Sequence, residues 1–209
     1  MPIRASLLAV VLVLLLLPLG GCIGAQSTAA REFPSFPPEG LAQGAPANVL
    51  LTVTFTASGM PGSEKLRQFQ DAKIEDLAEN LLNQTGGVRV ALNPSEAQYR
   101  LALKVNDMGG GRAAEIARTI SYILLTVPPS WVTQEYTTVA ELTGPSGNLV
   151  AQRRDVHSLT TITELFLLLG MPFAGVEDAH QEMWTAVLKD VSVWTAEQVA
   201  RVNAAGGAR

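Results

Sequence analysis

The stretch LTVTFTA, Leu51–Ala57, alternates apolar side chains with threonines. Leu51, Val53 and Phe55 fall on one side of an extended chain, and the threonines fall on the other. A period of two is typical of a β-strand that buries one face and exposes the other. The stretch therefore predicts a half-buried strand, and the sequence on its C-terminal side shows what accompanies it.

A helix and two further strands are predicted after this first strand. Pro61-Gly62-Ser63 introduces the helix, which runs to about Gln84, and Gly86-Gly87 ends it. Its apolar side chains on one side are Leu66, Phe69, Leu77 and Leu81. Strands are predicted over Val88–Leu92 and Tyr99–Val105, on either side of a turn at residues 93–95.

The second half of the chain predicts a hairpin followed by helices. TGPSGN is turn chemistry, so Val132–His157 reads as two paired strands. Thr161-x-x-Glu164 has the pattern of a capping box and predicts a short helix that ends at Gly170 and Pro172.

Two more helices are predicted near the C-terminus. The first has apolar side chains at helical spacing, namely Val176, Met183, Val187 and Val191. A second capping box, Thr195–Gln198, predicts a separate last helix, with Trp194 packing on Val199.

The predicted fold class is α+β, with one mixed, twisted sheet of about five strands and helices packed on it. Residues 48–209 form one domain of ordinary size in this prediction. The order of strand, "LAENLL" helix and "GGVRV" strand resembles lipoproteins of the Gram-negative envelope. These include the curli-secretion lipoprotein family and proteins with a fold like the amino-terminal domain of TolB. The resemblance implies a periplasmic α/β domain and transfers no residue-level function.

The N-terminus has the three parts of a secretory signal. Met1–Arg4 carries a positive charge, Leu7–Leu17 is apolar, and Pro18 breaks the run before Leu19-Gly20-Gly21-Cys22. The apolar run is too short for a spanning helix, which needs about 20 residues. Residues 1–21 are therefore predicted to be a cleaved signal peptide.

"LGGC" resembles the lipobox of bacterial lipoproteins. The resemblance implies cleavage between Gly21 and Cys22 and attachment of diacylglycerol and further acyl chains, such as palmitate, to Cys22. Ile23 rather than Asp follows, which by the same resemblance implies the outer membrane and its periplasmic side. Residues 22–47 are rich in Gly, Ala, Ser and Pro and predict a flexible linker.

The composition weakens several function classes. The net charge of −4 and the lack of a basic cluster weigh against nucleic acid binding. Neither the G-x-S-x-G motif of a hydrolase nor a P-loop is present. The two histidines, His157 and His180, lack the spacing of a metal or catalytic set. We therefore expect no catalytic residue, metal site or cofactor.

One apolar stretch remains, ISYILLTVPPSWV at residues 120–132, and LFLLLGMPFAGV at 165–176 is similar in composition. Both are candidates for buried core or for a contact surface toward a partner, a second copy or the bilayer. The candidate contact residues are Tyr122, Leu124, Leu125 and Trp131.

Three functions are compatible with the sequence. The favoured one is a non-enzymatic interaction or assembly module, anchored in the envelope, that binds an envelope protein or another copy of itself. The second is a carrier of lipid or another apolar ligand, which a cavity would support. The third is an enzyme of unrecognised type, which a cleft with converging carboxylates and His157 would support.

Overall fold

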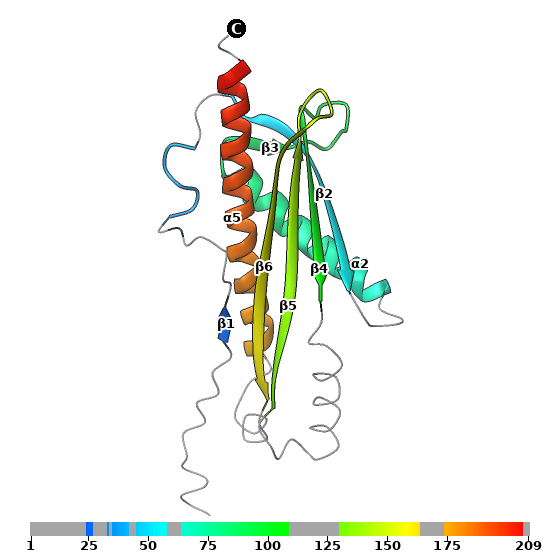
Figure 1. The fold of residues 1–209 in the computed structure, drawn as a ribbon. Helices are drawn as coiled ribbons and strands as arrows, with labels where there is room; N and C mark the ends of the chain where they lie inside the picture. Colours follow the sequence, from blue (N-terminus) through cyan, green and yellow to red (C-terminus); the bar gives the residue numbers. More distant parts are fainter. Residues whose placement is uncertain are drawn as a thin grey trace, which may run out of the picture.

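A computed structural model describes residues 24–26, 33, 35–41, 45–57, 64–108, 130–163 and 174–206. The described elements are β1 (Gly24–Gln26), β2 (Ala47–Ala57), α2 (Glu64–Gln84), β3 (Val88–Val90), β4 (Tyr99–Asp107), β5 (Ser130–Thr143), β6 (Leu149–Thr163) and α5 (Ala174–Gly206) (Figure 1).

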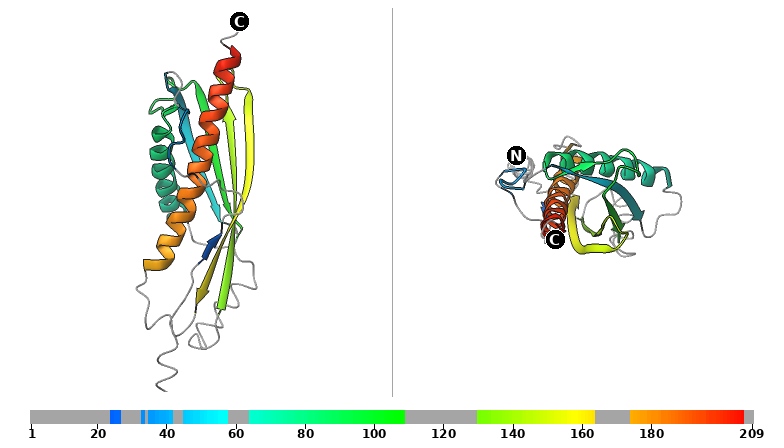
Figure 2. Two further views of the ribbon diagram at one scale, coloured as in Figure 1. Left: turned by 90° about the vertical axis from the view of Figure 1, so that its left-hand side faces the viewer. Right: turned by 90° about the horizontal axis from the view of Figure 1, so that it is seen from above.

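The strands form one mixed sheet in the order β1-β6-β5-β4-β2-β3. Strand β2 is parallel to both β3 and β4, whereas the β4–β5, β5–β6 and β6–β1 pairs are antiparallel. Both helices lie on the same face of the twisted sheet (Figure 2). The predicted α+β class with one mixed sheet is therefore confirmed. Strands β3 and β4 flank β2 on opposite sides, so the turn between them carries the chain across β2.

The core lies between this face of the sheet and the two helices. Leu101, Leu103 and Val105 of β4 are at most 1% exposed, whereas Arg100 and Lys104 on the opposite face are exposed. The two helices contribute buried apolar side chains to the same core, including Ile74, Ala78, Leu81 and Leu82 from α2 and Met183, Val187, Leu188 and Val191 from α5. The alternation of apolar and polar residues in β4 therefore predicted its buried face correctly. Within the described ranges, no helix combines the length and apolar character needed to cross a membrane.

The short helix predicted to start at Thr161 is wrong at its beginning. Thr161 and Thr163 belong to β6, where they pair with Val132 and Ser130 of β5. β-branched residues fit a pleated strand well, and the long antiparallel ladder extends through them. Pairing with β5 therefore outweighs the helix-capping preference of the pattern Thr161-x-x-Glu164. Residues 164–173, the rest of that predicted helix, lie outside the described residues.

The separate last helix predicted from Thr195 is also wrong, because α5 runs without a break from Ala174 to Gly206. Thr195 lies inside it, is completely buried, and donates its hydroxyl hydrogen bond to the carbonyl of Val191 at 2.8 Å. No glycine or proline interrupts residues 176–204, and buried apolar positions continue past Thr195 at Ala196 and Val199. Packing against the sheet therefore keeps the helix continuous.

Part of the stretch expected to be a linker lies against the domain. Strand β1 pairs with β6, with Gly24 opposite Thr160. Farther along, Phe36 and Leu41 are half-buried against the core, and the Lys189 ammonium lies 5.5 Å from the centre of the Phe36 ring. The next strand of the sheet, β2, then starts at Ala47.

Candidate functional site

Polar side chains interrupt the apolar core along one line between β6, β5 and α5. Strand β6 contributes them at alternate positions, so they share one face of the strand and point toward α5. We call this group the polar seam; it comprises Arg153, Asp155 and His157 of β6, Tyr136 of β5, and His180 and Asp190 of α5. The seam joins a buried histidine, a buried aspartate and an arginine within the described core, which makes it the candidate site.

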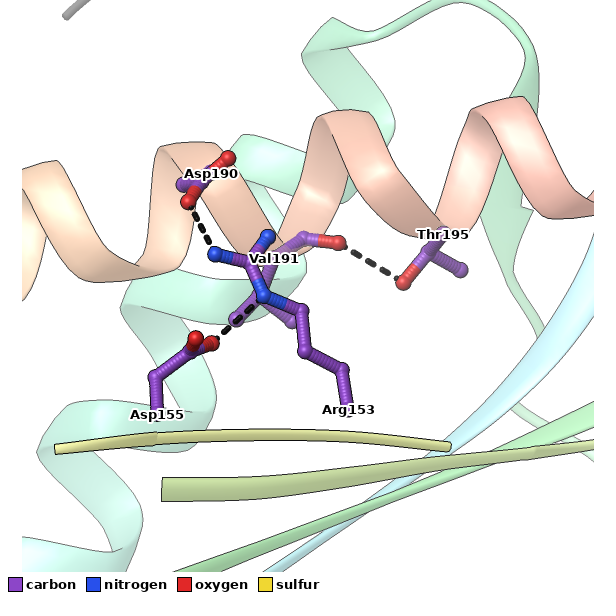
Figure 3. A network of polar contacts seen from close by, with 5 residues as sticks. All are labelled: Arg153, Asp155, Asp190, Val191 and Thr195. Atoms are coloured by element: carbon purple, nitrogen blue, oxygen red, sulfur yellow. Dashed lines mark hydrogen bonds and ion pairs between the residues drawn. The ribbon is translucent and has the colours of Figure 1, made fainter. Parts of the chain in front are cut away.

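Arg153 is the centre of the seam (Figure 3). Its Nη2 donates to Asp190 Oδ2 at 2.6 Å, and its Nε pairs with Asp155 Oδ2 at 2.6 Å. Burial alone would lower the pKa of Arg153, but the hydrogen bonds and charges of Asp190 and Asp155 raise it above its usual value. The Asp190 side chain is only 2% exposed, so Arg153 is the cation that makes a buried carboxylate tolerable on this helix.

His157 lies two residues farther along β6, opposite Tyr136 of β5. It is 1% exposed. Burial lowers the pKa of His157; the charges of Asp155 and Asp190 oppose this effect, and that of Arg153 adds to it. The ring is therefore held neutral under the helix, where a proton would place a second cation beside Arg153.

The seam continues toward the first turns of α5 as an aromatic cluster. The Tyr136 ring meets Trp184 edge-on, with ring centres 5.3 Å apart. The Tyr136 hydroxyl lies 3.3 Å from Nε2 of His180 and 3.4 Å from the side-chain oxygen of Gln134. Burial raises the pKa of Tyr136, and the negative charge of Asp107 raises it further. Tyr136 is therefore a neutral hydrogen-bonding group at neutral pH.

The stability of the protein should fall as the pH drops below about 6.5, the ordinary pKa of histidine. The folded pKa of His157 is lowered, so the unfolded chain binds the proton more readily, and stability present above this pH is lost on acidification. We expect a slope of up to about 1.4 kcal/mol per pH unit. Urea titrations at several pH values measure it. His157→Gln should flatten the slope, and an unchanged slope in that variant would assign the effect to other groups.

The contacts of the seam join β6 to α5, and few of its polar groups are accessible to a substrate. A general acid or base must come within hydrogen-bond reach of the reacting group, about 2.6–3.2 Å. His157 and Asp190 are closed off by the helix and sheet, and the donors of Arg153 face two carboxylates. Among the described residues, no three His, Cys, Asp or Glu side chains are arranged to hold a metal ion.

The residues singled out from the sequence are placed as follows. Gly21 and Cys22 lie outside the described residues, as do Tyr122, Leu124 and Leu125. The backbone of Trp131 belongs to β5 and pairs with Ile162 of β6, and its side chain is outside the description. The lipid attachment and the contact surface therefore stay predictions.

The seam itself was missed in the sequence, although two signals mark it. Arg153, Asp155 and His157 occupy every second position of a predicted strand, which puts three ionisable groups on one face. Asp190 stands within the apolar run VLKDVSV of a helix. A charge on an apolar helix face needs a partner, and only the fold shows that the partner is Arg153.

A hollow lies at the edge of the sheet opposite to the seam. It has a volume of about 550 Å³ and lies between the end of α2 and β3, where Glu79, Asn83, Arg89 and Leu92 line it. Asn83 uses its side-chain oxygen to accept the backbone N–H of Val90, so it completes this sheet edge. The lining offers one carboxylate, Glu79, and one guanidinium, Arg89, and no histidine or nucleophile, so we do not assign a reaction to it.

Comparison with known proteins gives likenesses of structure alone. The sequence matches no protein-family model and no curated protein. A DUF330-family protein of Xanthomonas campestris is similar in structure, with a TM-score of 0.48 and 13% identity over 88% of this chain and 97% of that chain. PelC of Paraburkholderia phytofirmans, solved as a dodecamer, has a TM-score of 0.36 at 13% identity, covering 82% and 98%. A minor lipoprotein of Acinetobacter baumannii has a TM-score of 0.29 at 10% identity, covering 75% and 92%. At these scores the likenesses assign neither a residue nor an activity to this chain.

Proposed function

We propose that this protein is a lipoprotein anchored through Cys22 in the outer membrane, facing the periplasm, and that its domain is a non-enzymatic interaction or assembly module. The observation that carries the second part is the polar seam. Arg153 pairs with Asp155 and with Asp190 between β6 and α5, and two groups of the seam are almost fully buried, with His157 1% and the Asp190 side chain 2% exposed. Such groups serve the fold rather than a reaction.

The anchor rests on the sequence LGGC and on the absence of any other cysteine. An exported protein with a single thiol needs a use for it, and acylation supplies one. Each buried methylene contributes roughly 0.8 kcal/mol, and two or more chains give stable anchoring. The module would therefore act on partners that come to the membrane.

The face of the sheet opposite α2 and α5 is the surface we assign to a partner. It is polar, with Lys104 and Glu141 forming an ion pair at 2.8 Å across β4 and β5. Strand β6 also carries two exposed apolar side chains. Leu149 is 58% exposed and Val156 is 46% exposed. Mixed polar and apolar surface of this kind is usual at protein–protein contacts.

Three strains test the proposal: a deletion strain complemented with the wild-type protein, with Cys22→Ser, or with His180→Gln. Cys22→Ser should abolish labelling with a fatty acid, leave unprocessed precursor and fail to complement, because the acyl acceptor is gone. His180→Gln should be labelled and should complement fully. Labelled Cys22→Ser protein would refute the anchor. A His180→Gln protein that is stable and membrane-bound but does not complement the deletion would support the enzyme hypothesis.

A further inference from the structure

Exposed arginines gather on the face of the sheet that is turned away from α2 and α5 (Figure 2). Arg89 lies on β3, Arg100 on β4 and Arg154 on β6, each at a position that alternates with residues of the buried face. Arg201, near the end of α5, is the other exposed arginine in the described ranges. Positive charge is therefore collected on one face of a chain whose net charge is −4.

These three arginines of the sheet have no carboxylate partner in the part of the chain that the structure describes. The ion pairs there join Lys104 to Glu141, and Arg153 to Asp155 and Asp190. A guanidinium group is planar and presents donors that fit a carboxylate with two parallel hydrogen bonds. The exposed arginines are therefore suited to carboxylates that another molecule supplies.

The strand registers show how the charges are laid out. Arg154, Val139 and Lys104 lie side by side on three neighbouring strands. Because neighbouring strands are about 4.8 Å apart, the two cations lie roughly 10 Å from each other, with half-buried Val139 between them. Arg100 lies about 13 Å from Lys104 along β4. An apolar centre with a charged rim is the usual anatomy of a protein contact. We call this surface the basic face; it comprises Arg89, Arg100, Lys104, Val139 and Arg154.

The charges of the basic face favour one kind of occupant. The same face of a second copy would bring arginines against Arg100 and Arg154, and like charges that meet across a contact are strongly unfavourable. A nucleic acid carries a charge every 1.7 Å or so of its axis, far more densely than cations about 10–13 Å apart. Glu141, which pairs with Lys104 at 2.8 Å, would also repel a continuous polyanion. Separate carboxylates on a protein surface match the wider spacing.

We propose that the basic face binds an acidic surface of a partner protein in the envelope. Carboxylates of the partner pair with Arg100 and Arg154, and one of its apolar side chains covers Val139. The inference rests on the proposed function and adds to it the chemistry of the partner and the residues that meet it. Because the paired groups are exposed in the free protein, association weakens as the salt concentration rises.

Photo-crosslinking in cells tests this proposal. Benzoylphenylalanine replaces Val139, on the basic face, or Asn80, which is exposed on α2, in the full chain expressed in a deletion strain. Illumination joins the label to the molecule that lies against it, and mass spectrometry of the joined peptides identifies that molecule and its contact residues. From position 139 we expect a protein product whose joined peptide carries Asp or Glu.

Charge reversal on the basic face makes the test quantitative. Arg100→Glu combined with Arg154→Glu should lower the yield from position 139 about ten-fold or more, because like charges then meet across the contact. The corresponding pair of glutamine substitutions should lower it less. Arg201→Glu is the matched control, since it makes the same change at an exposed site on α5, and it should alter the yield less than about two-fold. Lysines in place of the partner's carboxylates should restore the yield. Circular dichroism and fatty-acid labelling show that each variant is folded and acylated.

Several results would overturn the proposal. They are a product with a second copy of this chain, a product with a glycan or a nucleic acid, a joined peptide without acidic residues, a yield that does not respond to the double reversal, and no product from position 139 at all.

Failure of the proposed function gives a different result in the same experiment. A protein product from position 80 and none from position 139 would leave an interaction module that uses another surface. No protein product from either position, in a strain that the labelled proteins complement, would refute the interaction module itself. Labelling of Cys22 with a fatty acid reports the anchor independently of both.

Discussion

Replacing Arg153 with methionine should lower the free energy of unfolding by about 3–5 kcal/mol. The substitution keeps much of the apolar stem but removes the cation that faces Asp190 at 2.6 Å. Asp190, whose side chain is only 2% exposed, then loses the cation nearest to it. This is a large share of a total stability of roughly 5–15 kcal/mol, so the variant should be marginally folded at best.

The neighbouring residue gives a matched control. Arg154 is exposed on the opposite face of β6, and Arg154→Met should change stability by less than about 0.5 kcal/mol. Urea titration of the detergent-solubilised protein, followed by tryptophan fluorescence, measures both variants. Arg153→Met combined with Asp190→Leu should recover much of the loss, because no buried charge remains on the helix. Equal stability of the two single variants would show that the seam contributes nothing to the fold.

The sequence could predict the sheet because its signal is repeated along each strand. In β2 and β4, alternate residues such as Leu51, Phe55, Leu101 and Leu103 are all on the buried face. A one-residue shift in register would expose the whole set, so the pattern and the fold constrain each other strongly. The existence of the strands and of the hairpin turn followed from this redundancy.

The two capping boxes failed because four residues carry little information. Thr161 fits a cap and a strand equally well, and only pairing with Val132 decides between them. Thr195 fits a cap when read alone, but its hydroxyl bonds to the carbonyl of Val191 within a helix that is buried on several sides. In both places tertiary contacts outweigh a local preference worth about 1 kcal/mol.

The polar seam depended even more on tertiary structure. His157 and His180 were not expected to form a metal or catalytic set, and the structure places both beside Tyr136 in the seam. Arg153 and Asp190 are 37 residues apart in the sequence. The residues around either position do not indicate that the two side chains pair. Such pairs follow from how α5 lies across β6, which side-chain periodicity does not specify.

Replacing Ala196 with proline distinguishes a continuous α5 from a separate last helix that begins at Thr195. If a helix began with a cap at Thr195, Ala196 would be its first helical residue, where proline is favoured. In the continuous α5, residue 196 lies in the interior, 2% exposed. Proline there removes a backbone hydrogen bond to the preceding turn and its ring meets that turn, which costs about 3 kcal/mol or more.

We therefore expect Ala196→Pro to lose at least about 3 kcal/mol of stability and to unfold near room temperature in mild denaturant. Ala196→Gly is the graded control, because it keeps the N–H group and should lose only about 1 kcal/mol through helix propensity, plus the contact of one methyl group. Circular dichroism during urea titration follows both variants. A proline variant as stable as the glycine variant would mean that the helix is broken before residue 196, and the capping box at Thr195 would then be the correct description. The expected order, with proline far below glycine, follows because Thr195 and Ala196 lie buried within one uninterrupted helix that packs against the sheet and the Gly86-Gly87 turn.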